Sequence, residues 1–492
     1  MAGLLVVNAN IWGWEDADSL LVEDDKIVAV GREDRLRRIA RPCVEIFDAG
    51  GKLVIPGLTD AHMHLLSYAR TKEWIDLKGA KSIDEIKRLV KSKAADKRPG
   101  EWILGRGWDQ DKLDEKRMPT RWDLDEVAPN NPVLLVRVCG HVAVVNSRAL
   151  KVMGLTDESP DPPDGVLGRE GGRLNGRLYE GAVELAYSSI PGPSLEKAAS
   201  LIREVLREVA SYGLVELHSM SATNFEVEAY RKAYSPELPR VYFYAESFDV
   251  KGGEVIGLKT FMDGSFGART ARLREPYSDA PSTRGLLLLS AEKLEALISK
   301  ASERGWQVAV HAIGDEAVEK VLEVSNHRPL RVEHASLTPP DLVEKLAELD
   351  VPVSVQPHFI ASDTWIVDRL GERARWVYAY KTLLRRGVRI AGSSDAPVEP
   401  IDPWTGVYAA VDRGRSLSLP IWSASPGEAL SVSEALNLYL YGPVLRGGVP
   451  RELSPGATAD FAVLNVYDIS EICTRPMCSV LTVIGGLIAH KG

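Results

Sequence analysis

The sequence predicts an α/β protein built on a (β/α)8 TIM barrel, and three observations lead to this fold class. The middle of the chain alternates short apolar runs with amphipathic helical stretches, which is typical of parallel β/α units. Eight such runs can be distinguished, the number that closes a barrel. Both ends of the chain are instead β-rich and lack long helical periods. An open, doubly wound sheet is the alternative that periodicity alone does not exclude.

The two ends of the chain share the same β-rich texture. Residues 1–52 contain "GLLVVNANIW", "SLLVEDDKIVAVG" and "VEIFDAGGKLVIPG", which Gly, Asp and Asn punctuate. Residues 446–492 contain the similar segments "ATADFAVLNV" and "VLTVIGGLIAHKG". We therefore expect a small β-sandwich domain formed by both termini, with residues 1–52 as its first part and residues 446–492 as its second.

The predicted barrel comprises residues 53–64 and 200–445. Helical stretches such as "SLEKAASLIREVLREVASYG" and "SAEKLEALISKASERG" separate most of its strand-like runs. These runs are Leu53–Ile55, Gly213–His218, Arg240–Ala245, Val255–Met262, Gln307–His311, Leu330–His334, Val351–Val355 and Val388–Ala391.

Residues 65–199 are too many for one connection between a strand and its helix. This segment is rich in Trp, Asp, Gly and Pro, as in "GRGWDQDKLDEKRMPTRWD", and it contains a further strand-like run at residues 132–147. We predict an α+β insertion after strand one that has its own small fold and lies over the barrel mouth.

Composition and charge exclude several classes of function. The 492 residues are 45% hydrophobic and 26% charged, as in globular proteins. The net charge of −9 and the absence of a basic run argue against a nucleic-acid partner. No apolar run reaches the roughly 18 residues of a membrane span. The expected partner is a small-molecule substrate.

Cysteine usage and the N-terminus indicate a reducing, cytoplasmic location. The N-terminal apolar stretch has no basic region before it, unlike a signal peptide. Cys43, Cys139, Cys473 and Cys478 show neither zinc-ribbon nor disulfide-scaffold spacing, although a Cys473–Cys478 disulfide stays open. Glutamine occurs only at positions 110, 307 and 356, whereas Lys, Arg and Glu are plentiful, a bias typical of thermophile proteins.

The motif "VIPGLTDAHMH" closes on His62 and His64, one residue apart. Residues i and i+2 of a strand share one face, so both imidazoles project together. Two neighbouring nitrogen donors suit a borderline metal such as zinc. Taken alone, the motif is explained about as well by two hydrogen-bonded core histidines.

Three further metal-competent side chains follow predicted strands: His311 ends "WQVAVH", His334 ends "LRVEH" and Asp395 ends "GVRIAGSSD". In a barrel, the C-terminal ends of the strands meet at the face where active sites are built. A solitary histidine at a strand end is more often structural, but this whole set is hard to assign to core packing. We predict a site for one or two divalent ions, with zinc as the first choice among metals that these donors accept.

Lys259 lies within the apolar run of "GLKTFMDGS", where an unpaired ammonium is costly. Three interpretations stay open: the side chain extends outward to solvent, it pairs with a charge, or it carries CO2 as a carbamate. A carbamate has two oxygens and can bridge two metal ions roughly 3.5–4 Å apart. Residue spacing does not distinguish these interpretations.

Substrate contacts are expected from the loops and the insertion. The candidates are Asp109 in "GWDQ", His141 in "CGHVAVVNS" and His358 in "QPHF". For each residue, a surface turn or a structural hydrogen bond is about as good an explanation as a substrate contact.

Five segments together resemble the amidohydrolase superfamily: "GLTDAHMH", "GLKTFMDGSFGART", "VAVHAIGD", "RVEHAS" and "AGSSDAPVEP". More narrowly, they are similar to its branch of YtcJ-like metal-dependent hydrolases, which includes N-substituted formamide deformylase. The resemblance covers nearly the whole chain, because "GGKLVIPG" and "LSPGATADFAVLN" resemble the family's split β domain. It also implies that barrels of this type often pair, so a homodimer is a further expectation.

The resemblance assigns metal-binding roles to residues of this chain. The matching positions are His62 and His64 from strand one, His311 from strand five, His334 from strand six and Asp395 from strand eight. Lys259 matches the strand-four lysine that is carboxylated in binuclear members. Residues beside the ligands, such as Asp315, are expected to orient the imidazoles.

The expected activity is hydrolysis of an amide-type, non-peptide C–N bond in a small molecule. A metal acidifies water, and Asp395 serves as the general base that accepts its proton and returns it to the leaving amine. The enzymatic alternatives are a mononuclear zinc deaminase and a cyclic amidohydrolase. The non-enzymatic alternative is a catalytically silent barrel used as a binding scaffold, which we would expect to have lost some of these ligands.

Overall fold

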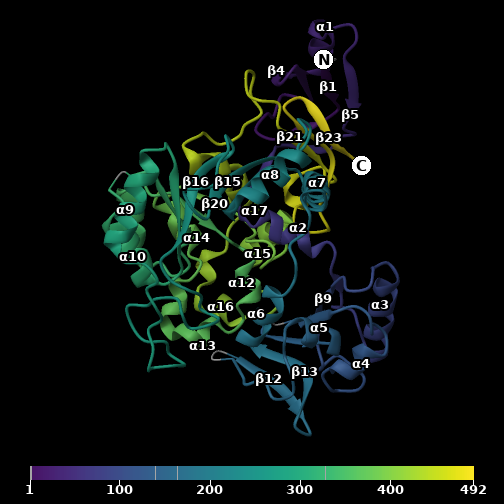
Figure 1. Ribbon diagram of the computed structural model, residues 1–492. Coiled ribbons are helices and arrows are strands. Elements are labelled where there is room, and N and C mark those ends of the chain that lie inside the picture. Colours follow the sequence, from purple (N-terminus) through teal and green to yellow (C-terminus); the bar gives the residue numbers. More distant parts are fainter. Residues whose placement is uncertain (1–2, 139, 163–164, 327) are drawn as a thin grey trace. The chain divides into compact units, whose positions relative to one another are not determined.

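The computed structural model describes residues 3–138, 140–162, 165–326 and 328–492. The chain folds into two compact units (Figure 1). The first unit comprises Met1–Ala69 and Leu195–Gly492, and the second comprises Arg70–Ser194.

The centre of the first unit is a parallel sheet of eight strands in the order β20-β19-β18-β17-β16-β15-β14-β7. The two end strands meet where the main-chain N–H of Asp395, just beyond β20, donates to the carbonyl of His62 on β7 at 2.7 Å. This arrangement confirms the predicted (β/α)8 barrel. Its strands are β7 (Leu58–Met63), β14 (Leu214–Ala222), β15 (Arg240–Ala245), β16 (Val255–Phe261), β17 (Gln307–Ala312), β18 (Leu330–His334), β19 (Val353–Val355) and β20 (Ile390–Gly392).

Helices cover the barrel because each presents one apolar stripe. In α7, apolar residues recur every three or four positions, and Ile202, Val205 and Leu206 are buried in the main core. Side-chain caps start several helices, as where Thr223 accepts from the main-chain N–H of Glu226. The longer helices of this unit are α7 (Leu195–Ser211), α8 (Asn224–Ala233), α9 (Ala291–Ser302), α10 (Asp315–Glu323), α11 (Pro340–Glu348), α15 (Pro403–Asp412) and α17 (Val432–Leu440), and the shorter ones are α1 (Glu33–Ile39), α2 (Leu65–Thr71), α12 (Phe359–Ser362), α13 (Ile366–Leu370), α14 (Tyr380–Arg385) and α16 (Pro420–Ala424).

Both ends of the chain build the expected β-sandwich. One sheet has the order β4-β3-β1-β5 and the other the order β2-β6-β21-β22-β23, and their side chains share one apolar core. Figure 1 shows both chain ends beside these strands. The strands are β1 (Leu4–Val7), β2 (Asn10–Ile11), β3 (Ser19–Glu23), β4 (Lys26–Gly31), β5 (Glu45–Asp48), β6 (Leu53–Pro56), β21 (Phe461–Leu464), β22 (Ser479–Ile484) and β23 (Leu487–Lys491).

The first barrel strand is not the run expected from the sequence. Leu53–Ile55 lies in β6 and pairs with β21 of the sandwich, so the barrel begins only at Leu58. The chain passes between the two sheets at Gly57, where an added Cβ would meet the side chain of Val215 at 2.6 Å. The apolar run pointed to β6 because β7 carries Asp60 and His62, which make it too polar to be recognised by hydrophobicity.

The second unit has a six-stranded sheet in the order β12-β13-β11-β10-β9-β8 and its own apolar clusters. The run at residues 132–147 forms two antiparallel strands instead of one, with the chain reversing between them. The placement of this unit over the barrel mouth stays a prediction. Its elements are β8 (Ile75–Asp76), α3 (Ile83–Ala95), β9 (Ile103–Trp108), α4 (Arg121–Asp125), β10 (Val133–Arg137), β11 (Val142–Val145), α5 (Ser147–Val152), β12 (Gly165–Glu170), β13 (Arg173–Glu180) and α6 (Gly181–Ser188).

Within the described residues, no helix is long and apolar enough to span a bilayer. The described cysteines, Cys43, Cys473 and Cys478, are free thiols, so the Cys473–Cys478 disulfide is not formed. Cys139 lies outside the described residues.

Candidate metal centre

The metal-competent residues gather at the C-terminal ends of the barrel strands. His62 lies near the end of β7, His311 near the end of β17, and His334 is the last residue of β18. His64 follows β7 directly, and Asp395 lies three residues beyond the end of β20. Most of this set is withdrawn from solvent, since His62 is 1%, His334 4% and Asp395 8% exposed.

His62, His64 and Asp395 form the tightest group. The Nε2 atoms of both histidines lie 3.4 Å from Oδ1 of Asp395. One ligand atom from each of the three residues lies within 4.8 Å of those of the other two, which is close enough for one ion to touch all three.

His311 and His334 extend this group. The ring centroids of His62 and His334 are 5.0 Å apart, and those of His334 and His311 are 4.5 Å apart. Strands one, five, six and eight thus bring their candidate ligands into one cluster.

Each of the four imidazoles has one nitrogen tied to the protein, which leaves its second nitrogen for a ligand. His62 Nδ1 lies 2.5 Å from Oε2 of Glu333, and His64 Nδ1 lies 3.1 Å from the carbonyl of Met220. His334 Nδ1 lies 2.6 Å from Oε1 of Gln356. His311 is tied through its other nitrogen, since Nε2 lies 2.9 Å from the carbonyl of Gly264. Ring orientation fixed in this way is typical of metal-binding histidines.

The electrostatics of the cluster favour a cation. Burial lowers the pKa of His62, but the carboxylates of Glu333 and Asp395 outweigh burial and raise it. Burial likewise acts to raise the pKa of Asp395, yet His62 and the hydrogen bonds from His62 and His64 hold it well below its usual range. Burial lowers the pKa of His334 to about 3, so this imidazole is neutral, the form that binds metals. These residues therefore fit a divalent ion.

Lys259 is buried on β16, beside the cluster. Its Nζ lies 4.0 Å from the centroid of the Phe261 ring, and no carboxylate among the described residues is within ion-pair distance. Burial lowers the pKa of this amine to about 8. The side chain therefore does not extend into solvent, and its amine lies over the Phe261 ring and is attracted by the carboxylates of Glu333 and Asp395, so the charge-partner and carbamate interpretations both stay open.

Asp263, in "FMDGS", ties the loops after strands four and five together. Its carboxylate accepts from the main-chain N–H groups of Ile313 at 3.0 Å, Gly314 at 2.9 Å and Arg272 at 2.8 Å. Asp315, the expected orienter of imidazoles, instead accepts from the main chain of Arg274. The "DGS" and "HAIGD" motifs thus fix a loop geometry around His311.

Asp60 performs the same task between strands one and eight. Its carboxylate accepts from the hydroxyl of Ser394 at 2.5 Å and from the main-chain N–H of His62 at 3.1 Å. Burial raises the pKa of Asp60 to about 6. The candidate ligands His62 and Asp395 are therefore held in register by a hydrogen bond between Asp60, two residues before His62, and Ser394, directly before Asp395.

Sequence reasoning missed Glu333, Gln356, Asp263 and Asp60. The available signal was position, because each is a polar residue within an apolar strand or directly after one, close to a ligand or loop motif. The sequence does not show which atoms these side chains contact. Glu333 and Gln356 contact imidazole nitrogens, whereas Asp263 and Asp60 accept from main-chain N–H groups.

The three candidate substrate residues have partners of their own. Asp109, in the second unit, lies 3.0 Å from Nη2 of Arg137, and the exposed His141 lies 3.0 Å from Oε2 of Glu180. His358 is buried, and its Nε2 lies 2.9 Å from the hydroxyl of Thr405. Substrate contact by these residues stays a prediction.

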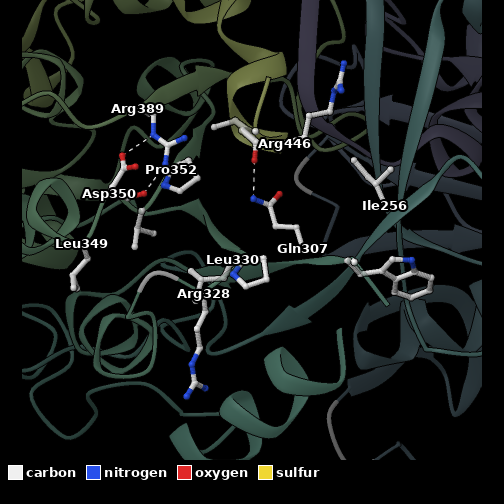
Figure 2. Close-up of a pocket in the computed structure, with 15 residues that line it drawn as sticks. Ile256, Gln307, Arg328, Leu330, Leu349, Asp350, Pro352, Arg389 and Arg446 are labelled. Carbon is white, nitrogen blue, oxygen red and sulfur yellow. Dashed lines mark hydrogen bonds and ion pairs between the residues drawn. The ribbon is translucent and has the colours of Figure 1, made fainter. Parts of the chain in front are cut away.

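A cavity of about 500 Å3 lies at the opposite ends of the strands (Figure 2). Ile256, Gln307 and Leu330, at or next to the first residues of β16, β17 and β18, line it. Figure 2 shows the Arg389–Asp350 ion pair at its edge. This cavity is therefore separate from the metal-competent cluster, which lies where the strands end.

Comparison with known proteins agrees with this geometry. The profile described as "Amidohydrolase family" matches residues 45–490. YtcJ of Bacillus subtilis (strain 168) is 34% identical, with 91% of this chain and 90% of YtcJ aligned. N-substituted formamide deformylase of Arthrobacter pascens is 27% identical over 94% of both chains. The crystal structure of an uncharacterized metal-dependent hydrolase from Pyrococcus horikoshii has a TM-score of 0.80 and 33% identity, covering 94% of this chain and 97% of that one.

Proposed function

The chain belongs to the amidohydrolase family, and from this premise we propose that it hydrolyses amide-type, non-peptide C–N bonds in a small molecule. It is a metal-dependent hydrolase of that superfamily, and the C–N specificity is the proposed step. The observation that carries the proposal is the cluster itself: four imidazoles, each held by the protein through one ring nitrogen, in one group with a buried aspartate.

We assign the metal to His62, His64, His311, His334 and Asp395, with zinc as the expected ion. A divalent ion in this place supplies an acidified water, with a pKa near 7, and polarises a carbonyl. Lys259 is proposed as the ligand that allows a second ion, once its neutral amine has taken up CO2 as a carbamate. Its lowered pKa, about 8, supports this proposal because only the neutral amine reacts with CO2.

Asp395 is the proposed general base. Its lowered pKa keeps it ionised at neutral pH, and its carboxylate lies 3.4 Å from Nε2 of both His62 and His64. The carboxylate takes one proton from the attacking water as the C–O bond forms. It returns that proton to the leaving nitrogen as the C–N bond breaks, giving an amine and a carboxylic acid, which releases its own proton to solvent at neutral pH.

The proposed substrates are N-formyl and N-acyl amines. The similarity to N-substituted formamide deformylase over 94% of both chains supports this class. Nothing in the cluster selects the substituent on nitrogen, so a panel of formamides and acetamides is the first screen.

The test joins metal analysis of the purified protein to that screen. We expect one or two zinc ions per chain, loss of amide hydrolysis after chelation, and recovery when zinc is restored. Release of ammonia from a ring amidine would replace the proposal by a deaminase. A protein that binds no divalent ion and hydrolyses no substrate of the panel would contradict it and favour a binding scaffold.

A Lys259→Ala variant separates the carbamate proposal from the rest. We expect it to retain one ion and lose the second, whereas Phe261→Leu, its matched control on the same face of β16, should retain both. Equal metal content in Lys259→Ala and the parent protein, with no carbamate signal in the 13C spectrum after labelling with 13C-bicarbonate, would overturn it.

A further inference from the structure

The interior of the barrel holds a column of hydrogen-bonded side chains, formed by Glu333, Arg331, His218 and Glu216. The column begins at the metal-competent cluster. Glu333 contacts His62 through Oε2, and its other oxygen, Oε1, accepts from Nε of Arg331 at 2.5 Å. Arg331 and Glu333 are both fully buried, with 0% exposure. The acid that holds a proposed metal ligand is thus itself held by a buried guanidinium.

Arg331 has a partner for each of its guanidinium nitrogens. Nη2 donates to the carbonyl of Ala61 at 2.7 Å, next to His62 in the chain, and Nη1 lies 2.9 Å from Nδ1 of His218. The guanidinium also lies over the ring of Tyr244, at 4.3 Å from its centroid. The side chain therefore fixes both the acid behind His62 and the backbone beside it.

The protonation of His218 follows from its two partners. A guanidinium only donates, so Nδ1 of His218 must accept, and its proton is on Nε2. That Nε2 lies 3.0 Å from Oε1 of Glu216, which accepts it. His218 is thus a neutral imidazole with one defined tautomer. It accepts from the buried Arg331 guanidinium and donates to the buried Glu216 carboxylate, so both partners restrict the orientation of its ring.

Glu216 ends the column towards the starts of the strands. It is fully buried and accepts from Nη2 of Arg451 at 2.6 Å and from Nη2 of Arg446 at 3.2 Å. Both arginines belong to the segment that leads from the barrel to the sandwich strand β21. Every charge in the column is therefore paired, which is the condition for tolerating charges inside a protein.

We propose that Arg331, His218 and Glu216 are positioning residues that hold Glu333 on Nδ1 of His62 and so keep His62 Nε2 aimed at the metal. This inference rests on the proposed metal centre. None of the three residues touches the cluster of ligands, and their effect passes through Glu333. Interior positions of such barrels are commonly filled by branched apolar residues, so a fully paired charged column calls for a role beyond filling space.

The test compares Arg331→Met and His218→Leu, which break the column, with His218→Gln, which retains an acceptor and a donor. Tyr244→Phe is the control, since it removes a buried hydroxyl but keeps the ring against Arg331. Zinc affinity is measured by competition with a chelator, and the Nδ1 proton of His62 is observed by NMR in metal-free protein labelled at histidine. A short hydrogen bond to a carboxylate places this proton far downfield.

We expect about 10–100-fold weaker zinc binding in Arg331→Met and His218→Leu, as for other partners of metal-binding histidines. The downfield proton signal should be lost in both and kept in His218→Gln and Tyr244→Phe. Folded Arg331→Met or His218→Leu protein with parental zinc affinity and an unchanged signal would overturn the column's role. Parent protein that binds no zinc would overturn the proposed function instead, and the proton signal of metal-free protein would still decide the column.

Discussion

The two faces of the barrel strands are equally buried but differ in chemistry. On β14, Leu217 packs into the apolar layer beneath the helices, whereas its neighbours Glu216 and His218 belong to the charged column. On β18, Val332 packs outward and its neighbours Arg331 and Glu333 pair with each other. Alternation along a strand therefore separates two kinds of core within one sheet.

The apolar outer layer and the charged inner column contribute differently to the protein. Apolar contacts have no preferred direction, so the outer layer supplies free energy of folding but does not dictate the angle of any one side chain. Hydrogen bonds between charged groups are directional, and each partner restricts the next. The outer layer stabilises the barrel, and the inner column orients the metal centre.

The largest expected effect is that of Asp395→Asn, which changes the proposed general base in the metal-competent cluster, where the inner column begins. The amide cannot accept the proton of water, so kcat/KM for amide hydrolysis should fall by about 10²–10⁴-fold. Circular dichroism and the thermal midpoint provide the check that folding is retained. Activity within a few-fold of the parent would show that another group is the base.

The next effect sharpens the contrast between the two cores. Leu217→Ala removes buried apolar volume from the outer layer and should lower the free energy of unfolding by about 2–5 kcal/mol, measured in urea. Zinc affinity should stay within about twofold of the parent, because no hydrogen bond of the column changes. A large loss of zinc affinity in this variant would remove the distinction between the two cores.

The sequence anticipates much of the outer core and the ligands but little of what lies between them. Periodicity marks barrel strands such as Leu330–His334, because their outward residues are apolar and their lengths are regular. It fails at β7, where Asp60 and His62 interrupt the apolar run, and the sandwich strand β6 is mistaken for strand one. His334 and Asp395 are found because one ends an apolar run and the other comes shortly after one. The column is not, because the Arg331–His218 pair joins residues 113 positions apart, and no local pattern encodes that pairing.

The smallest effect concerns pH and isolates one member of the column. Burial, with Arg331 adding to it, lowers the native pKa of His218 from 6.5 to about 4. The unfolded chain therefore binds a proton below pH 6.5 that the folded chain refuses until about pH 4, so the contribution of His218 to stability is present at neutral pH and is lost as pH falls through this window.

The comparison that reveals this is His218→Gln against the parent, unfolded in urea at several pH values between neutral and the lower end of the window. The parent should lose stability relative to the variant by about 1.4 kcal/mol per pH unit. Other buried groups whose pKa is shifted, such as Asp60 and Asp263, titrate in both proteins and cancel in the difference. Parallel curves would mean that His218 takes up its proton in the folded protein as readily as in the unfolded chain. A doubly protonated imidazole cannot accept from the Arg331 guanidinium, which only donates, so that result would break the column at its neutral link.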